Sequence, residues 1–212
     1  MYVYRSLFVS LLLILLAAPV LTAQDVAAKQ LLVCYGDSIT AGYGLQRGQA
    51  FPDVLQRDLD RRGFRYKVRN QGTSGATTKD AVAGLSAIVR LHPEIVTVEF
   101  GGNDGLRGLP LEQTRRNLDT VLTKLESAHI KILLAGITLP PNYGQDYIKQ
   151  FDQIFRDLAA KHHVAFVPMI YVNLANVPGT IQADGIHPTA KGSEIIAQTL
   201  MQAMNPLLSR SE

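Results

Sequence analysis

The sequence contains a single cysteine, Cys34, so no intramolecular disulfide can form in any compartment. Cys34 lies within an apolar run, where we expect a small buried side chain. The sequence also lacks long runs of like charge. Its formal net charge is +3, and basic pairs such as Arg61-Arg62 stand alone within amphipathic segments. This distribution argues against a nucleic-acid-binding surface.

The apolar run near the N-terminus is too short to span a membrane as a helix. It follows Arg5 and is about 12 residues long, whereas a bilayer requires roughly 20. Small residues ending at Ala23 come after it, which completes the order of a secretory signal peptide. We predict a signal peptide over residues 1–23 and one mature domain over residues 24–212. The mature domain would be periplasmic or secreted, without a stable membrane anchor. The alternative is that residues 1–23 remain as an uncleaved anchor.

Segments of strand type and helix type alternate along the rest of the chain. We expect strands at residues 31–35, 66–68, 95–100, 130–137 and 164–167, and helices at residues 52–63, 77–91, 110–128, 148–160 and 192–204. Such alternation predicts a single α/β domain with three layers, α/β/α, around a central five-stranded parallel sheet. In such sheets ligands bind beyond the carboxyl ends of the strands.

Four polar, glycine-rich clusters follow the expected strands. They are Gly36-Asp37-Ser38, NQGTSGATT (70–78), GGNDG (101–105) and ADGIHP (183–188). Each cluster alone is typical of turns, because glycine, asparagine and aspartate favour them. Together, however, they would bring a serine, a glycine, an amide and an Asp-x-x-His pair to one edge of the sheet.

Acyl transfer requires groups of these kinds. A serine nucleophile needs a base, the base needs an orienting acid, and the developing oxyanion needs preorganised donors. Asp184 and His187 are three residues apart with Gly185 between them, so one turn can bring the carboxylate to the imidazole Nδ1. The other histidines lie near predicted helix ends, where we expect surface positions or helix C-terminal charge partners: His92, His129, His162 and His163.

The four clusters resemble the sequence blocks of the SGNH hydrolases, also called the GDSL esterase/lipase family. GDSITAGYGL, VEFGGNDGLRG, LPPNYG and DGIHP are similar, in that order, to the bacterial thioesterase I, lysophospholipase L1 and arylesterase branch, over about residues 30–205. The resemblance implies a flavodoxin-like SGNH fold and an enzyme that hydrolyses small-molecule carboxylic esters or thioesters through an acyl-serine intermediate. It implies no metal and no organic cofactor.

Residue by residue, the resemblance implies Ser38 as the nucleophile, His187 as the general base and Asp184 as the acid that orients it. It also implies an oxyanion hole made of the Ser38 backbone N–H, the Gly75 backbone N–H and the Asn103 side-chain amide. Glycine allows the backbone to approach a substrate oxygen closely, and asparagine supplies a neutral donor.

Loops at residues 43–50, 104–110 and 138–147 are expected to shape the substrate site. Their apolar side chains favour a medium acyl chain over acetate, and the candidates are Leu45, Leu106, Leu109 and Leu139. Tyr143 either lines the acyl pocket or caps a loop. Asp37 is expected to form hydrogen bonds within its loop rather than to take part in catalysis.

Three other functions fit the sequence less well. A dinucleotide-binding loop would place glycines directly after the first strand, whereas Gly42 comes seven residues after Tyr35. An α/β-hydrolase would need Gly-x-Ser-x-Gly, and GDSIT lacks the last glycine. A catalytically inactive SGNH-fold binding protein is the alternative of another class, although every catalytic role has a residue present.

Overall fold

The structure is a computed structural model that describes residues 29–174 and 177–209. Five parallel strands form its central sheet, in the order β2-β1-β3-β4-β5. The strands are β1 (Gln30–Gly36), β2 (Tyr66–Gly72), β3 (Ile95–Glu99), β4 (Lys131–Ala135) and β5 (Ala165–Val167). The signal peptide predicted over residues 1–23 lies outside the described residues.

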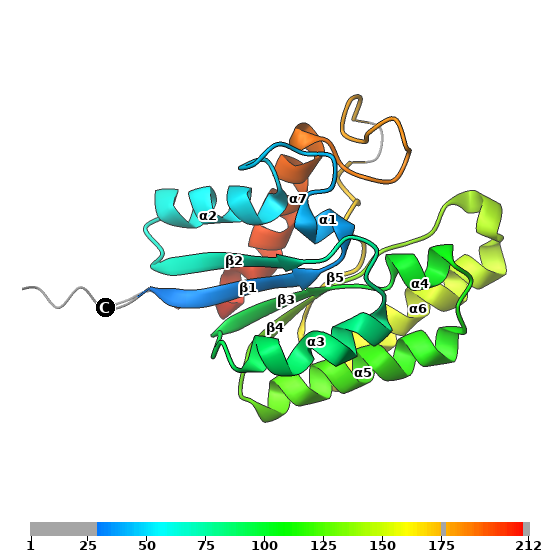
Figure 1. Ribbon diagram of the computed structural model, residues 1–212, viewed down its shortest axis with the longest axis horizontal. Helices are drawn as coiled ribbons and strands as arrows, with labels where there is room; N and C mark the ends of the chain where they lie inside the picture. The colour runs from blue at the N-terminus through cyan, green and yellow to red at the C-terminus, as the bar shows by residue number, and fades with distance from the viewer. Residues whose placement is uncertain (1–28, 175–176, 210–212) are drawn as a thin grey trace, which may run out of the picture.

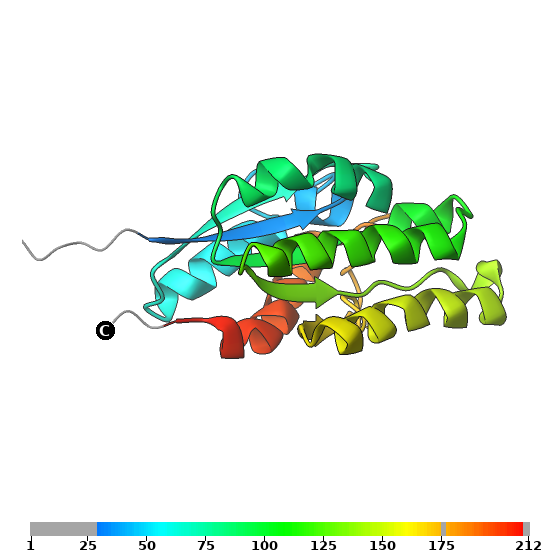
Figure 2. The same ribbon diagram turned by 90° about the horizontal axis from the view of Figure 1, so that it is seen from below.

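Helices cover both faces of the sheet (Figures 1 and 2). On one face α2 (Phe51–Arg61) packs against α7 (Ala190–Met204), and on the other α3 (Thr78–Val89) packs against α5 (Leu111–Ser127), which contacts α6 (Gln145–His162). Short helices complete the order: α1 (Ser38–Ala41), α4 (Gly102–Leu106), η1 (Pro141–Tyr143) and η2 (Asn205–Leu207). The predicted three-layer α/β/α fold with a five-stranded parallel sheet is confirmed.

Burial explains which strand boundaries the sequence predicts well. All five residues of β3 are buried, because helices cover both faces of the central strands, and a continuous apolar run marks such a strand. The edge strand β2 was predicted to end at Val68, but it pairs with β1 as far as Gly72. After Tyr66 its residues are exposed or half-buried, so polar residues such as Arg69 and Gln71 are tolerated there.

The first turn of α6 also escaped the sequence prediction. The helix begins at Gln145, three residues before the predicted start, directly after Gly144 at φ 85°. Its first residues are exposed, so they carry no apolar periodicity. Among the helices of the described residues, none is both long enough and apolar enough to cross a bilayer.

Two glycine-rich clusters that the sequence marks as turns contain short helices. Asp37 is the N-cap of α1, and Gly101, at φ 117°, is the N-cap of α4. At Gly36 a Cβ atom would collide with the Thr40 side chain and with Glu99. The bare residues therefore let the chain turn sharply at the end of β1 and pack directly against β3.

The order of the strands places these clusters at a topological switch point. β1 lies between β2 and β3, so the chain leaves β1 to one side and later returns on the other. A crevice forms beyond the carboxyl ends of two such strands. Ser38 follows β1 and Asn103 follows β3, so both lie at this edge.

Candidate active site

Ser38, His187 and Asp184 form one continuous chain of hydrogen bonds. The Ser38 Oγ lies 2.8 Å from the His187 Nε2, and the His187 Nδ1 lies 2.7 Å from the Asp184 Oδ2. Ser38 opens α1, whereas the other two residues come from the loop before α7. The histidine side chain is 16% exposed, so it is accessible from the cavity while most of its surface is packed.

The loop around Asp184 determines which ring nitrogen carries a proton. The backbone N–H groups of Ile186 and His187 donate to Asp184 Oδ1 at 2.9 and 3.0 Å. Bonding to the His187 N–H, then to its ring and to the Ile186 N–H, lowers the pKa of Asp184 to about 2. The resulting carboxylate only accepts, so Nδ1 donates to it. In the neutral ring, Nε2 is then free to accept the serine proton.

Three further side chains hold this loop and its histidine. Gln182 Nε2 donates to the Tyr43 carbonyl at 2.8 Å, and the Tyr171 hydroxyl donates to the Ile186 carbonyl at 2.9 Å. The Tyr43 ring lies against the imidazole of His187, with 4.6 Å between ring centroids and a 39° tilt. The sequence analysis missed these residues, because no spacing pattern links them to the histidine.

Gly75, a predicted donor of the oxyanion hole, lies at the same cavity as Ser38. Its φ of 80° is in the left-handed region that favours glycine. The Arg107 guanidinium donates to the Gly75 carbonyl at 2.9 Å and thereby holds the loop after β2 against α4. The sequence analysis did not single out Arg107, although it lies in the same block as Asn103.

The Asn103 amide lies at this cavity and is already engaged by two acceptors. Its Nδ2 donates to the Asp37 Oδ2 at 3.1 Å and to the Ala76 carbonyl at 3.0 Å. Because both neighbours are acceptors, the end of the amide that faces them must be the nitrogen. This nitrogen therefore lies beside Asp37, the residue that precedes the nucleophile. Both N–H hydrogens of this nitrogen are thereby used, so an oxyanion formed nearby would have to share or replace one of these two acceptors.

A buried carboxyl pair lies beneath the nucleophile. Asp37 is 2% exposed and Glu99 is 1% exposed. Burial raises the pKa of Asp37 to about 6; burial and then the charge of Asp37 raise the pKa of Glu99 well above its usual range. Asp37 Oδ1 accepts from the Ile39 N–H at 3.0 Å, as its predicted loop role requires, but its bond to Asn103 was not predicted.

A cavity of about 480 Å³ opens beside Ser38. Two of the apolar candidates, Leu106 and Leu139, line it together with Ile137; Leu45, Leu109 and Tyr143 are not among its lining residues. The Tyr143 hydroxyl donates to the Leu106 carbonyl at 2.8 Å, so this ring supports a loop of the cavity wall from behind. Among the residues that the structure describes, no three acidic, histidine or cysteine side chains could hold a metal ion.

Comparison with known proteins identifies the family. The model of the GDSL-like lipase/acylhydrolase family matches residues 34–195. The chain belongs to this family.

Individual relatives extend the match over most of the chain. Esterase TesA of Pseudomonas aeruginosa is 40% identical over 192 residues, which cover 90% of this chain and 95% of TesA. Thioesterase 1/protease 1/lysophospholipase L1 of Escherichia coli is 36% identical, covering 89% of each chain. A crystal structure of TesA aligns with a TM-score of 0.81 at 38% identity, covering 84% of this chain and all of that one.

Proposed function

We propose that this protein hydrolyses carboxylic esters or thioesters through an acyl-serine intermediate. The observation that carries the proposal is the unbroken series of contacts from Asp184 through His187 to the Ser38 hydroxyl. In the first step Ser38 Oγ attacks the acyl carbonyl carbon, and its proton passes to His187 Nε2. The tetrahedral intermediate collapses, and the alcohol or thiol leaves with that proton. Water then attacks the acyl-serine by the same route and releases the acid.

The oxyanion of both tetrahedral intermediates is held by three donors in this proposal. They are the backbone N–H groups of Ser38 and Gly75 and the side-chain amide of Asn103. Support comes from their position at one cavity, at the carboxyl ends of neighbouring strands. The Asp184 carboxylate keeps the ring in the tautomer that accepts from serine and stabilises the imidazolium that forms.

The cavity favours a small-molecule substrate with a medium acyl chain. Ile39, Ile137 and Leu139 give its wall an apolar character, and its volume of about 480 Å³ is within the range of small-ligand sites. Esterase TesA and the thioesterase 1/protease 1/lysophospholipase L1 are named for ester, thioester and lysophospholipid chemistry, which supports the same substrate classes here. A hydrolysis series over acyl chain lengths that peaks at acetyl would contradict this choice.

Export is part of the proposal on sequence grounds alone. Residues 1–23 have the order of a signal peptide, and residues 24–212 would form the exported domain, in the periplasm or outside the cell. Neither nucleic acid nor a metal or organic cofactor enters the reaction as written.

The decisive test is intact-mass spectrometry after treatment with a fluorophosphonate. In the wild-type protein we expect a single adduct, because Ser38 Oγ displaces fluoride from phosphorus while His187 takes its proton. Ser38→Ala, the matched control, should remain unlabelled and should retain the wild-type circular-dichroism spectrum. A folded wild-type protein without an adduct would overturn the proposal and favour a binding protein of the same fold.

A further inference from the structure

The carboxyl pair below the nucleophile is not used by the reaction as written. Asp37 and Glu99 come from the ends of neighbouring strands, β1 and β3, and both are almost completely buried. Two isolated buried carboxylates would repel each other strongly, so such pairs retain a proton. The pair lies next to the proposed oxyanion donors, because Asp37 accepts a hydrogen bond from the Asn103 amide.

The hydrogen bonds around Glu99 leave room for that proton. The Thr40 hydroxyl donates to Glu99 Oε2 at 2.7 Å, whereas the other oxygen, Oε1, is buried without a donor or acceptor partner. A buried polar atom of this kind normally has a partner. A proton shared with the neighbouring Asp37 carboxyl group would provide one.

The other side of the pair reaches the oxyanion hole. Asp37 uses Oδ1 to accept from the Ile39 N–H and Oδ2 to accept from the Asn103 amide. A carboxylate acceptor therefore orients the Asn103 side chain with its nitrogen toward the cavity. Swapped ends would present the amide oxygen, which would repel an oxyanion.

We propose that Asp37 and Glu99 share one proton and act as positioning residues for the Asn103 amide. The inference rests on the proposed acyl-serine chemistry. The shared proton has two consequences. It leaves Asp37 able to hold Asn103, and it keeps the charge beneath the developing oxyanion at one negative unit instead of two. Loss of the proton would add a second negative charge close to the oxyanion and would slow its formation.

Other ionisable side chains lie close to the two carboxyl groups. His187 faces Asp37 from the loop before α7 and favours its charged form, and Asp184 lies behind that histidine. Tyr171, from the segment after β5, is buried near both carboxyl groups, and burial followed by the charges of Glu99 and Asp37 raises its pKa, which keeps it neutral.

Because the two groups titrate as a pair, their protons come off in two steps that belong to the pair. The lower step lies near the pKa of about 6 to which burial raises Asp37. The higher step, which reflects the strongly raised pKa of Glu99, gives a separate alkaline limb. That limb distinguishes the pair from the triad.

The test is kcat and KM against pH for a p-nitrophenyl ester, measured for the wild type, Glu99→Gln, Glu99→Met and Asp37→Asn. Glutamine keeps a donor toward Asp37 without a titratable proton, so kcat should lose its alkaline decline. Methionine keeps the size but removes the donor, so kcat should fall about tenfold more than with glutamine, which is the rescue expected of a conservative change. Asp58→Asn, another buried carboxyl on α2, is the matched control and should keep the wild-type profile.

Asp37→Asn should lower kcat by about 10- to 100-fold and leave KM within about twofold. That loss is smaller than the roughly 100- to 1,000-fold loss expected when an oxyanion donor is removed outright, as in Asn103→Ala. Labelling of Ser38 by the fluorophosphonate should persist in Asp37→Asn, because the serine and histidine are untouched.

A further variant keeps the test decisive if a carboxyl variant fails to fold. Thr40→Val preserves both carboxyl groups but removes the hydroxyl that stabilises charged Glu99, so the alkaline limb should move to higher pH. An unchanged limb in Thr40→Val or Glu99→Gln, or wild-type kcat in Asp37→Asn, would overturn the inference. A wild-type protein that shows neither turnover nor labelling would instead overturn the proposed function itself.

Discussion

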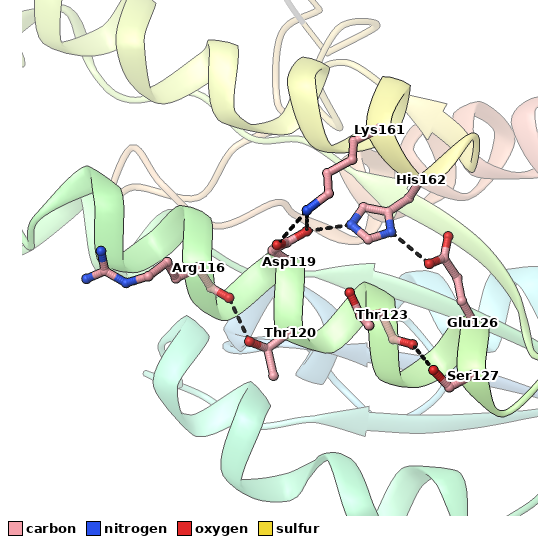
Figure 3. Close-up of polar contacts among 8 residues, drawn as sticks. All are labelled: Arg116, Asp119, Thr120, Thr123, Glu126, Ser127, Lys161 and His162. Carbon is pink, nitrogen blue, oxygen red and sulfur yellow. Dashed lines mark hydrogen bonds and ion pairs between the residues drawn. The ribbon is translucent and has the colours of Figure 1, made fainter.

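His187 and His162 both lie against carboxylates, yet their surroundings give them opposite roles. His187 has Asp184 on one nitrogen and the Ser38 hydroxyl on the other. His162, in the last turn of α6, has carboxylates on both: Asp119 at 2.6 Å and Glu126 at 2.8 Å, each from α5 (Figure 3). Only the first arrangement leaves a nitrogen that can take up a proton from another group.

The His162 cluster joins two helices instead. Lys161 donates to both oxygens of Asp119 at 2.7 Å, so Lys161 and His162 of α6 meet two acidic side chains of α5 (Figure 3). The His162 side chain is 5% exposed, and each of its ring nitrogens lies within hydrogen-bond distance of a carboxylate oxygen. The sequence predicted a surface position or a helix C-terminal charge partner for this histidine, and the structure places it in the second setting, in the last turn of α6 beside two acidic side chains. Both histidines contact a carboxylate, so the group at the second ring nitrogen makes the difference. A hydroxyl there allows His187 to take up a proton, whereas a second carboxylate makes His162 a link between two helices.

Replacing His187 should produce the largest change in this comparison. His187→Gln removes the proton acceptor of Ser38, and we expect kcat to fall by at least about a thousandfold. The free energy of unfolding should stay close to that of the wild type, because the ring lies at a cavity. Parallel steady-state kinetics and urea unfolding measure the two effects. A variant that retains more than about a tenth of the wild-type kcat would exclude His187 as the general base.

The corresponding change at His162 should affect stability and not turnover. Glutamine has one amide group and cannot donate to carboxylates on two sides, so His162→Gln should lower the free energy of unfolding by about 1–3 kcal/mol. Its kcat should remain within about twofold of the wild type. His163→Asn, the exposed neighbour at φ 49°, is the matched control and should change stability by less than about 0.5 kcal/mol. Equal urea midpoints for the two variants would contradict a bracing role for His162.

The smallest expected effect concerns acid stability. The hydrogen bonds of Asp184, chiefly to the His187 N–H, hold its folded pKa at about 2, below the unfolded value of about 3.9. A depressed folded pKa contributes stability that is present above the unfolded value and is lost as pH falls from about 4 toward 2. Asp184→Asn should therefore flatten the stability curve slightly in that window, since exposed groups contribute little. Thermal unfolding at several pH values would measure this, and a slope equal to the wild type would exclude the effect.

The sequence determined most of the fold and the main candidates of the site. Continuous apolar runs located the three central strands, β1, β3 and β4, because a strand buried on both faces has no polar side. The edge strand β2 and the first turn of α6 were less well predicted, since exposed residues need no apolar pattern. Ser38, Asp184 and His187 were visible because each lies in a short motif directly after a strand or before a helix.

Tertiary structure alone decided the contacts between distant segments. Asp37 and Asn103 are 66 residues apart, and Ser38 and His187 are 149 apart. Nothing local in the sequence marks Glu99 as the partner of Asp37, because it occupies an ordinary position at the end of an apolar strand. These pairs form where parallel strands end side by side, so strand order and register bring them together. The motifs specify which chemical groups are present; the sheet determines which of them meet.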